Sequence, residues 1–345
     1  MEKIRVACLF GGCSSEYEVS LVSATSVLRN MKQEKYIVDM IGITKGGDFY
    51  LYEGDIDEIE RDNWYHENTC RKITFSTNRC DHGFILLDTN EVISIDIAFP
   101  ILHGKNGEDG RLQGLFELAG IPYVGCGMMS SGLCMDKYLA HKLVEIEGIL
   151  VPKSYMFTKY DLDKIDGTLD LEYPIFVKPL KAGSSFGITK VTKKEMLKQA
   201  VELAFSYDDT IVIEEGIDGF EVGCAILGNE ELTIGEVDEI ELQDGFFDYE
   251  EKYTLKTSKI ILPARLSEET RSAIKEVALK IYKILGCKGF SRVDMFYTKE
   301  GTIVFNEVNT IPGCTSHSRY PSMLQEVGYC FEDVIDTLIA LGLAK

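Results

Sequence analysis

Segments typical of strands and of helices alternate along the first third of this chain. Strand-like apolar runs lie at residues 4–10, 36–44 and 93–102. A helix-like segment at 18–31 follows the first run, and another at 112–120 follows the third. This alternation predicts an α/β fold whose first sheet is mostly parallel and flanked by helices. Such folds bind ligands at the carboxyl ends of the strands, where this chain has two Gly-bearing loops, "FGGCSSEYEVS" and "LHGKNGEDGRLQG".

Length and composition indicate a globular protein of two or three domains. The chain has 345 residues, of which 45% are hydrophobic, so it can bury a sizeable core. Beyond residue 152 the pattern changes to hairpins. We therefore predict boundaries near residues 125 and 217, which divide the chain into 1–125, 126–217 and 218–345.

The charge and the cysteines restrict the partners and the cell compartment. Thirty-six basic and 56 acidic residues give a formal net charge of -20, the wrong sign for binding a nucleic-acid backbone. No apolar run is long enough to span a bilayer, and the opening "MEKIRVACLFGG" resembles a strand more than a signal peptide. Ten cysteines without Cys-x-x-Cys spacing favour reduced thiols and a cytoplasmic location.

The segment "FNEVNTIPG" places polar side chains at the end of an apolar strand. Because strand side chains alternate, Glu307 and Asn309 share one face and Val308 points away. The same rule puts Arg292 and Asp294 of "FSRVDMFY" on one face. If these strands pair, Asp294, Glu307 and Asn309 offer Mg²⁺ a set of oxygen ligands beside Arg292. The alternative is a pair of exposed strands with solvated acids.

A second candidate site is the strand–loop–strand segment "FVKPLKAGSSFGITKV". Its glycines free backbone N–H groups, and Ser184, Ser185 and Lys178 add hydroxyls and a positive charge that suit a phosphate. The loop is not a Walker loop, because G-x-x-x-x-G-K-[ST] is absent from the chain. An ordinary hairpin is the alternative.

Three further residues stand in loops or at a helix start that could meet a ligand. Lys137 of "MDKYLAHKL" lies at the start of a predicted helix, a position that favours an anionic ligand. His103 and His317 lie in the loops after two predicted strands. A solvated lysine and ordinary hydrogen-bonded histidines are the alternatives. No His/Cys cluster indicates zinc, and no G-x-S-x-G motif indicates a serine nucleophile.

Taken together, seven motifs in chain order resemble those of the D-alanine–D-alanine ligases of the ATP-grasp superfamily. They are "GGCSSEYEVS", "LHGKNGEDGRLQG", "MDK", "FVKPLKAGSSFG", "FFDYEEKY", "FSRVDMF" and "NEVNTIPGCTSHS". The resemblance covers nearly the whole chain. It implies an N-terminal Rossmann-like domain (1–125) followed by the central (126–217) and C-terminal (218–345) parts of an ATP-grasp fold. It also implies ATP between the last two sheets, two Mg²⁺ or Mn²⁺ ions, and a homodimer.

The resemblance assigns roles to residues motif by motif. The residues expected at ATP are Lys137, Lys178, Ser185, Glu214, Glu221 and Lys252, with Glu214 and Glu221 at the adenine and the ribose. The expected metal ligands are Asp294, Glu307 and Asn309, with Glu307 bridging both ions. The expected catalytic residues are Glu16, His103, Ser184, Tyr253, Arg292 and Gly313. Among these, Glu16 and His103 would hold the first D-alanine, whereas Arg292 and the Gly313 N–H would stabilise an oxyanion.

The second substrate is where the chain departs from the usual pattern. After "TSHS" most D-alanine–D-alanine ligases carry an apolar residue, but this chain has Arg319, next to Ser318. Asp238 and Phe247 are expected to hold Arg319, which resembles the VanG-type D-alanine–D-serine ligases of glycopeptide resistance. A site that hydrogen-bonds a hydroxyl rejects an analogue without one. The alternative is a structural salt bridge of Arg319 outside the pocket.

We therefore expect an ADP-forming ligase that joins D-alanine to D-serine through an acyl phosphate. It would act in peptidoglycan precursor synthesis and vancomycin resistance. Tyr253 of "EEKY" matches the amine-using ligases and argues against D-lactate. The alternatives are an ordinary D-alanine–D-alanine ligase, another ATP-grasp enzyme, a non-catalytic binding protein and an NAD-dependent oxidoreductase. The oxidoreductase leaves the C-terminal acids without a role.

Overall fold

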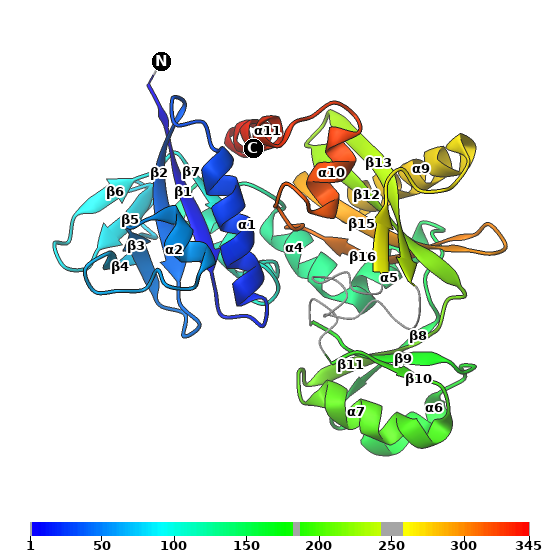
Figure 1. The fold of residues 1–345 in the computed structure, drawn as a ribbon. Coiled ribbons are helices and arrows are strands. Elements are labelled where there is room, and N and C mark those ends of the chain that lie inside the picture. Colours follow the sequence, from blue (N-terminus) through cyan, green and yellow to red (C-terminus); the bar gives the residue numbers. More distant parts are fainter. Residues whose placement is uncertain (1, 182–186, 243–257, 345) are drawn as a thin grey trace.

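The chain folds around three β-sheets, shown in Figure 1. The computed structural model describes residues 2–181, 187–242 and 258–344. A seven-stranded sheet lies in the N-terminal part, a four-stranded sheet in the middle and a five-stranded sheet in the C-terminal part. The predicted α/β class is therefore confirmed. The boundaries near residues 125 and 217 stay predictions.

The first sheet has the order β6-β5-β4-β3-β2-β1-β7. Its strands are β1 (Ile4–Gly11), β2 (Tyr36–Ile43), β3 (Phe49–Tyr52), β4 (Cys70–Phe75), β5 (Gly83–Leu86), β6 (Val92–Ser94) and β7 (Ile97–Pro100). The strand pairs β2-β1 and β1-β7 are parallel, a single parallel bridge joins Tyr123 to Ala98 of β7, and the other neighbours are antiparallel. The parallel part is thus smaller than the alternation predicted. The segments that join β2 to β3 and β5 to β6 are too short for the crossover that parallel strands need.

The helices of this part of the chain follow strands of the first sheet, and the last two of them pack against β16 (Ile303–Asn309) of the third sheet. They are α1 (Tyr17–Asn30), α2 (Ile56–Glu60), α3 (Arg111–Ala119), α4 (Met128–Met135) and α5 (Lys137–Ile146). Asp136 caps α5, because its carboxylate accepts a hydrogen bond from Leu139 N at 3.0 Å. Lys137 therefore begins a helix, as predicted.

The second sheet is antiparallel throughout, with the order β10-β9-β11-β8. Its strands are β8 (Ser154–Thr158), β9 (Ile175–Pro179), β10 (Thr189–Val191) and β11 (Thr210–Glu215). Two short 3₁₀ turns (Leu162–Lys164 and Lys194–Met196) precede α6 (Ile165–Thr168) and α7 (Leu197–Phe205). Apolar residues of α7 pack on β9 and β11 and close a small core of their own.

The third sheet carries Arg292 and the three predicted metal ligands, and its order is β14-β13-β12-β15-β16. Its strands are β12 (Gly219–Gly228), β13 (Leu232–Leu242), β14 (Ser258–Ile261), β15 (Gly289–Thr298) and β16 (Ile303–Asn309). The accompanying helices are α9 (Glu268–Ile284), α10 (Arg319–Gln325) and α11 (Phe331–Leu343).

The two faces of this sheet have different partners. Val222, Cys224 and Ile226 of β12 belong to the core that α9 closes, whereas Ala225 and Leu227 belong to the core that contains α10. Strand side chains alternate between faces. The odd-numbered positions of β12 therefore face α10 and the predicted second-substrate pocket.

Strands β15 and β16 pair as predicted. Arg292 lies opposite Asn309 and Asp294 opposite Glu307, whereas the next pair joins Met295 to Phe305. Asn306 is the extra residue of a β-bulge at this point. The bulge lies before Glu307, so the alternation that places Glu307 and Asn309 on one face is intact.

Helix α10 was missed in the sequence, because "SHSRYP" contains a proline. Ser318 is the N-cap and Arg319 the first helical residue, so Pro321 stands in the first turn. The backbone N–H of that turn needs no helical partner, and proline is tolerated there.

Helix α11 returns the end of the chain to the first sheet. Val334, Ile335 and Leu338 share one apolar core with residues of α1 and β7. Asp336 accepts hydrogen bonds from Lys32 Nζ at 2.8 Å and from Tyr36 OH at 2.8 Å. Figure 1 shows α11 beside α1. None of the helices in the described ranges is long and apolar enough to cross a membrane.

Helix α9 covers one face of the third sheet, so a buried isoleucine of α9 should contribute more to the free energy of unfolding than an exposed isoleucine of α5. Ile281 of α9 is 0% exposed and Ile146 of α5 is 79% exposed. We expect Ile281→Ala to lower the free energy of unfolding by about 2–5 kcal/mol through the cavity that it leaves. The matched Ile146→Ala variant should change it by no more than about 0.5 kcal/mol. Urea unfolding measures both, and equal losses would contradict the packing described.

Candidate active site

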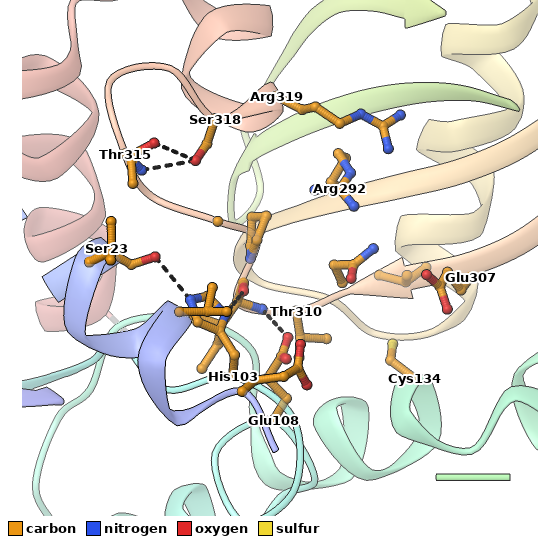
Figure 2. A pocket seen from close by; sticks show the side chains of 18 of the residues that line it. Ser23, His103, Glu108, Cys134, Arg292, Glu307, Thr310, Thr315, Ser318 and Arg319 are labelled. Atoms are coloured by element: carbon orange, nitrogen blue, oxygen red, sulfur yellow. Dashed lines mark hydrogen bonds between the residues drawn. The ribbon is translucent and has the colours of Figure 1, made fainter. Parts of the chain in front are cut away.

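A cavity of about 600 Å³ lies between the N-terminal loops and the third sheet. The predicted site residues that line it are Glu16, His103, Lys137, Arg292, Glu307, Asn309, Gly313, Ser318 and Arg319, together with His317. Figure 2 shows Arg292 and Arg319 on one side of this cavity and His103 and Glu108 on the other. Residues more than 200 positions apart in sequence are thus brought together.

Asp294 is the buried centre of the charged side, with 1% of its surface exposed. Arg292 donates to it twice, from Nε to Oδ1 at 2.8 Å and from Nη2 to Oδ2 at 2.7 Å. Asn309 Nδ2 donates to Oδ2 at 2.8 Å. Burial alone lowers the pKa of Arg292, but the charge of Asp294 outweighs it and raises that pKa above its usual value. Arg292 therefore stays protonated.

Lys137 adds a charge next to the same residues. Its Nζ lies 3.4 Å from Glu307 Oε2, and Glu307 stands directly opposite Asp294 in the strand register. Two carboxylates and one amide on adjacent strands are oxygen donors of the kind that Mg²⁺ takes, and Glu307 and Asn309 line the cavity, whereas Asp294 is not among its lining residues. Within the described residues no group of three His, Cys, Asp or Glu is arranged to hold a metal. The third donor of the predicted set is an asparagine.

Arg319 lies at the cavity wall and is paired with the predicted partner. Its Nε donates to Asp238 Oδ2 at 2.6 Å and its Nη2 donates to Asp238 Oδ1 at 2.8 Å. Its Nη2 also lies 3.4 Å from Asp294 Oδ1. The predicted pairing with Asp238 is confirmed. The salt bridge does not lie outside the pocket, because Arg319 also lines the cavity.

Arg319 has one partner that the sequence did not suggest. Its Nη1 donates to Glu221 Oε1 at 2.8 Å. Burial alone lowers the pKa of Arg319, but the charges of Asp238 and Asp294 raise it well above its usual value. Glu221, expected at the ribose, thus contacts the guanidinium of Arg319.

His103 is held by both ring nitrogens. Nδ1 lies 3.1 Å from Ile311 O, and Nε2 lies 3.1 Å from Ser23 Oγ. Because a carbonyl only accepts, Nδ1 carries the proton and Nε2 accepts from the Ser23 hydroxyl. Burial lowers the pKa of His103 to about 4, so the ring is neutral at pH 7. Ser23 was not singled out in the sequence, where it is one of several serines of α1.

Glu108 is a second residue that sequence reasoning missed. Its Oε2 accepts from Gly104 N at 2.8 Å and its Oε1 accepts from Ile311 N at 2.9 Å. Burial, with the charge of Glu16 as a second cause, raises the pKa of Glu108 to about 8. The motif "HGKNGEDG" contains Glu108, but a loop has no periodicity that tells this acid from its neighbour Asp109.

The loop before α10 is closed by short contacts. Thr315 N donates to Ser318 Oγ at 3.1 Å, and the hydroxyls of these residues lie 2.7 Å apart, as Figure 2 shows. A Cβ at Gly313 would lie 3.2 Å from Ser318 Oγ. Glycine therefore fits this tight turn, and Gly313 and Ser318 both line the cavity.

Two predicted ATP residues lie in the second sheet, away from this cavity. Lys178 of β9 donates to Glu214 Oε1 of β11, and both side chains are buried. The predicted residues Ser184, Ser185, Phe247, Lys252 and Tyr253 lie outside the described residues.

Family models match both halves of the chain. The model described as "D-ala D-ala ligase N-terminus" matches residues 5–126, and the model described as "D-ala D-ala ligase C-terminus" matches residues 143–340.

Known proteins match over almost their full length. The chain is 48% identical to the vancomycin C-type resistance protein VanC1 of Enterococcus gallinarum, over 98% of both chains. It is 45% identical to a D-alanine–D-alanine ligase of Caldicellulosiruptor bescii, over 100% of this chain and 96% of that protein. The crystal structure of the VanG D-Ala:D-Ser ligase from Enterococcus faecalis superposes with a TM-score of 0.91 and 53% identity, over 99% of this chain and 100% of that chain. This protein therefore belongs to the D-alanine–D-alanine ligase family, an ATP-dependent family, and its α/β structure with three sheets matches the ATP-grasp structures of that family.

Proposed function

We propose that this enzyme joins D-alanine to D-serine with the conversion of ATP to ADP. Family membership supports ligation of D-alanine to a second substrate. The names of two relatives, the VanG D-Ala:D-Ser ligase and the resistance protein VanC1, support a role in vancomycin resistance through altered cell-wall precursors. The homodimer and the cytoplasmic location implied by the sequence resemblance stay proposals.

The observation that carries the D-serine assignment is the buried guanidinium of Arg319 at the cavity wall. Arg319 is fixed by two hydrogen bonds to Asp238 and one to Glu221. A serine hydroxyl can both accept from the guanidinium and donate to a carboxylate. The guanidinium has five N–H donors and these bonds use three, so it can still donate to the serine hydroxyl, which D-alanine lacks.

In the first step, a carboxylate oxygen of D-alanine attacks the terminal phosphorus of ATP, and ADP leaves. Asp294, Glu307 and Asn309 would hold Mg²⁺, whose charge neutralises the transferring phosphoryl group. Lys137 lies beside Glu307 and adds its own positive charge there. The product is an acyl phosphate of D-alanine.

In the second step, the amine of D-serine attacks the acyl carbon, loses a proton and displaces phosphate. Arg292 and the N–H of Gly313 line the cavity and would donate to the oxyanion of the tetrahedral intermediate. Arg292 is already oriented by Asp294, so little reorganisation precedes the reaction.

Glu16 and His103 would hold the first D-alanine, in two different ways. Glu16 offers a carboxylate to the ammonium group of the substrate. His103 is neutral and uses both ring nitrogens for Ser23 and Ile311. We therefore assign His103 a positioning role rather than proton transfer.

A D-alanine–D-alanine ligase of ordinary cell-wall synthesis is the second candidate. The 45% identity to the Caldicellulosiruptor bescii enzyme favours it. An NAD-dependent oxidoreductase leaves the acids of β15 and β16 unexplained.

Phosphate release from ATP tests the reaction. We expect release in the presence of Mg²⁺ and D-alanine to rise when D-serine is added. L-Alanine should give none, and chelation of Mg²⁺ should abolish release because the γ-phosphate charge is then not neutralised. Release that does not depend on D-amino acids would remove the ligase assignment.

Metal binding tests the donor set without turnover. We expect Glu307→Gln to weaken Mn²⁺ binding in the presence of a nonhydrolysable ATP analogue by more than about tenfold, since a ligand charge is lost. Titration followed by electron paramagnetic resonance measures this affinity. Glu300→Gln, in the exposed turn of the same hairpin, is the matched control. Equal affinities of the two variants would exclude Glu307 as a ligand.

Substitution of Arg319 tests the second substrate. We expect Arg319→Leu to lower the ratio of kcat/KM for D-serine to that for D-alanine by about 10- to 100-fold, the worth of a charged hydrogen bond. Arg319→Lys should also lower the ratio, because lysine cannot pair bidentately with Asp238.

The matched control is Arg71→Leu in the first sheet. Arg71 also donates two hydrogen bonds to one carboxylate, that of Asp88, at 2.9 Å each. Its loss should leave the substrate ratio unchanged. An unchanged ratio in Arg319→Leu would overturn the D-serine assignment.

A further inference from the structure

One cross-strand row of the third sheet contains three carboxylates and a glycine. Asp238 of β13 lies opposite Gly223 of β12, Gly223 lies opposite Asp294 of β15, and Asp294 lies opposite Glu307 of β16. Side chains in such a row share one face. The face is the one toward α10, from which Arg319 enters.

Gly223 needs an explanation because glycine weakens the interior of a strand. Its φ is not in the left-handed region, so the backbone conformation does not require glycine. Space does. A Cβ at position 223 would lie 2.3 Å from Arg319 Nη2, 2.8 Å from Asp238 Oδ1 and 3.0 Å from Asp294 Oδ1.

The guanidinium of Arg319 therefore lies where a side chain of residue 223 would lie. The backbone of residue 223 also binds Asp238, since Gly223 N donates to Asp238 Oδ1 at 2.9 Å. That same oxygen accepts from Arg319 Nη2. Glycine thus lets Asp238 come close enough to the β12 backbone to hold both donors.

We propose that Gly223 is a specificity-determining residue of the ligase. Because residue 223 has no side chain, the guanidinium of Arg319 can lie beside it and bind Asp238 bidentately, and we call this space the seat of Arg319. The seat sets the preference for a hydroxylated second substrate. The inference rests on the D-serine specificity proposed above and adds a residue that contacts no substrate. A larger residue at this position would displace the guanidinium and turn the enzyme toward D-alanine.

A double-mutant cycle of Gly223→Ala and Arg319→Leu tests this seat. The readouts are the D-serine to D-alanine ratio of kcat/KM and the midpoint of thermal unfolding. We expect Gly223→Ala to lower the ratio as much as Arg319→Leu does, about 10- to 100-fold. In the Arg319→Leu background, Gly223→Ala should have no further effect on the ratio and only a small effect on the midpoint.

Gly42→Ala is the matched control. Gly42 lies in β2 of the first sheet, and its Cβ would lie 2.3 Å from Trp64, as close as the clash at position 223. This variant should lower the unfolding midpoint equally with and without Arg319, and it should leave the substrate ratio unchanged.

The outcomes separate the two proposals. A wild-type ratio in Gly223→Ala, or an equal drop in both backgrounds, overturns the role of Gly223. An unchanged ratio in Arg319→Leu overturns the D-serine assignment instead, and the midpoints then decide whether the seat exists. If Gly223→Ala does not fold, recovery of folding in the double variant supports the seat, and a double variant that also fails to fold overturns it.

Discussion

The buried carboxylate of Asp294 is the interaction on which the site depends. A charge with 1% of its surface exposed is tolerated only because Arg292 and Asn309 donate hydrogen bonds to it and Arg319 lies 3.4 Å away. Each of these partners has a second proposed task, at the oxyanion, the metal or the second substrate. One desolvated charge therefore fixes the relative positions of three functional groups. Removal of Arg292 would leave it with one hydrogen bond from Asn309 and the more distant charge of Arg319.

The side of the cavity formed by His103 and Glu108 is held to the segment after β16 by the backbone of Ile311. Its carbonyl accepts from His103 and its N–H donates to Glu108, so both polar groups of one peptide segment are held by the N-terminal loops. Ile311 follows β16 by two positions. The two walls of the cavity are thereby joined through one peptide segment, although their residues belong to different parts of the fold.

The amino-acid pattern predicted those parts of the site that depend on local periodicity. Alternation along β15 and β16 was enough to place Arg292, Asp294, Glu307 and Asn309 on one face, and a β-bulge just outside that stretch did not disturb it. Glu108, Ser23 and Gly223 could not be predicted. Their roles come from contacts across the fold, 80 positions for Ser23 and 203 for Glu108, and loops and glycines carry no periodic signal. Arg319 was identified only through the resemblance to the ligase family. The helix that begins at Arg319 was not predicted because it contains Pro321.

The return of α11 to the first sheet bears on how the chain is made. Val334, Ile335 and Leu338 complete a core that α1 and β7 begin, and Asp336 joins Lys32 and Tyr36. During synthesis the N-terminal residues leave the ribosome first and fold as units where they can. Part of the apolar core beside the first sheet therefore stays uncovered until α11, at the end of the chain, has been translated. A chain cut short before α11 would expose the apolar side chains of α1 and β7 that α11 covers.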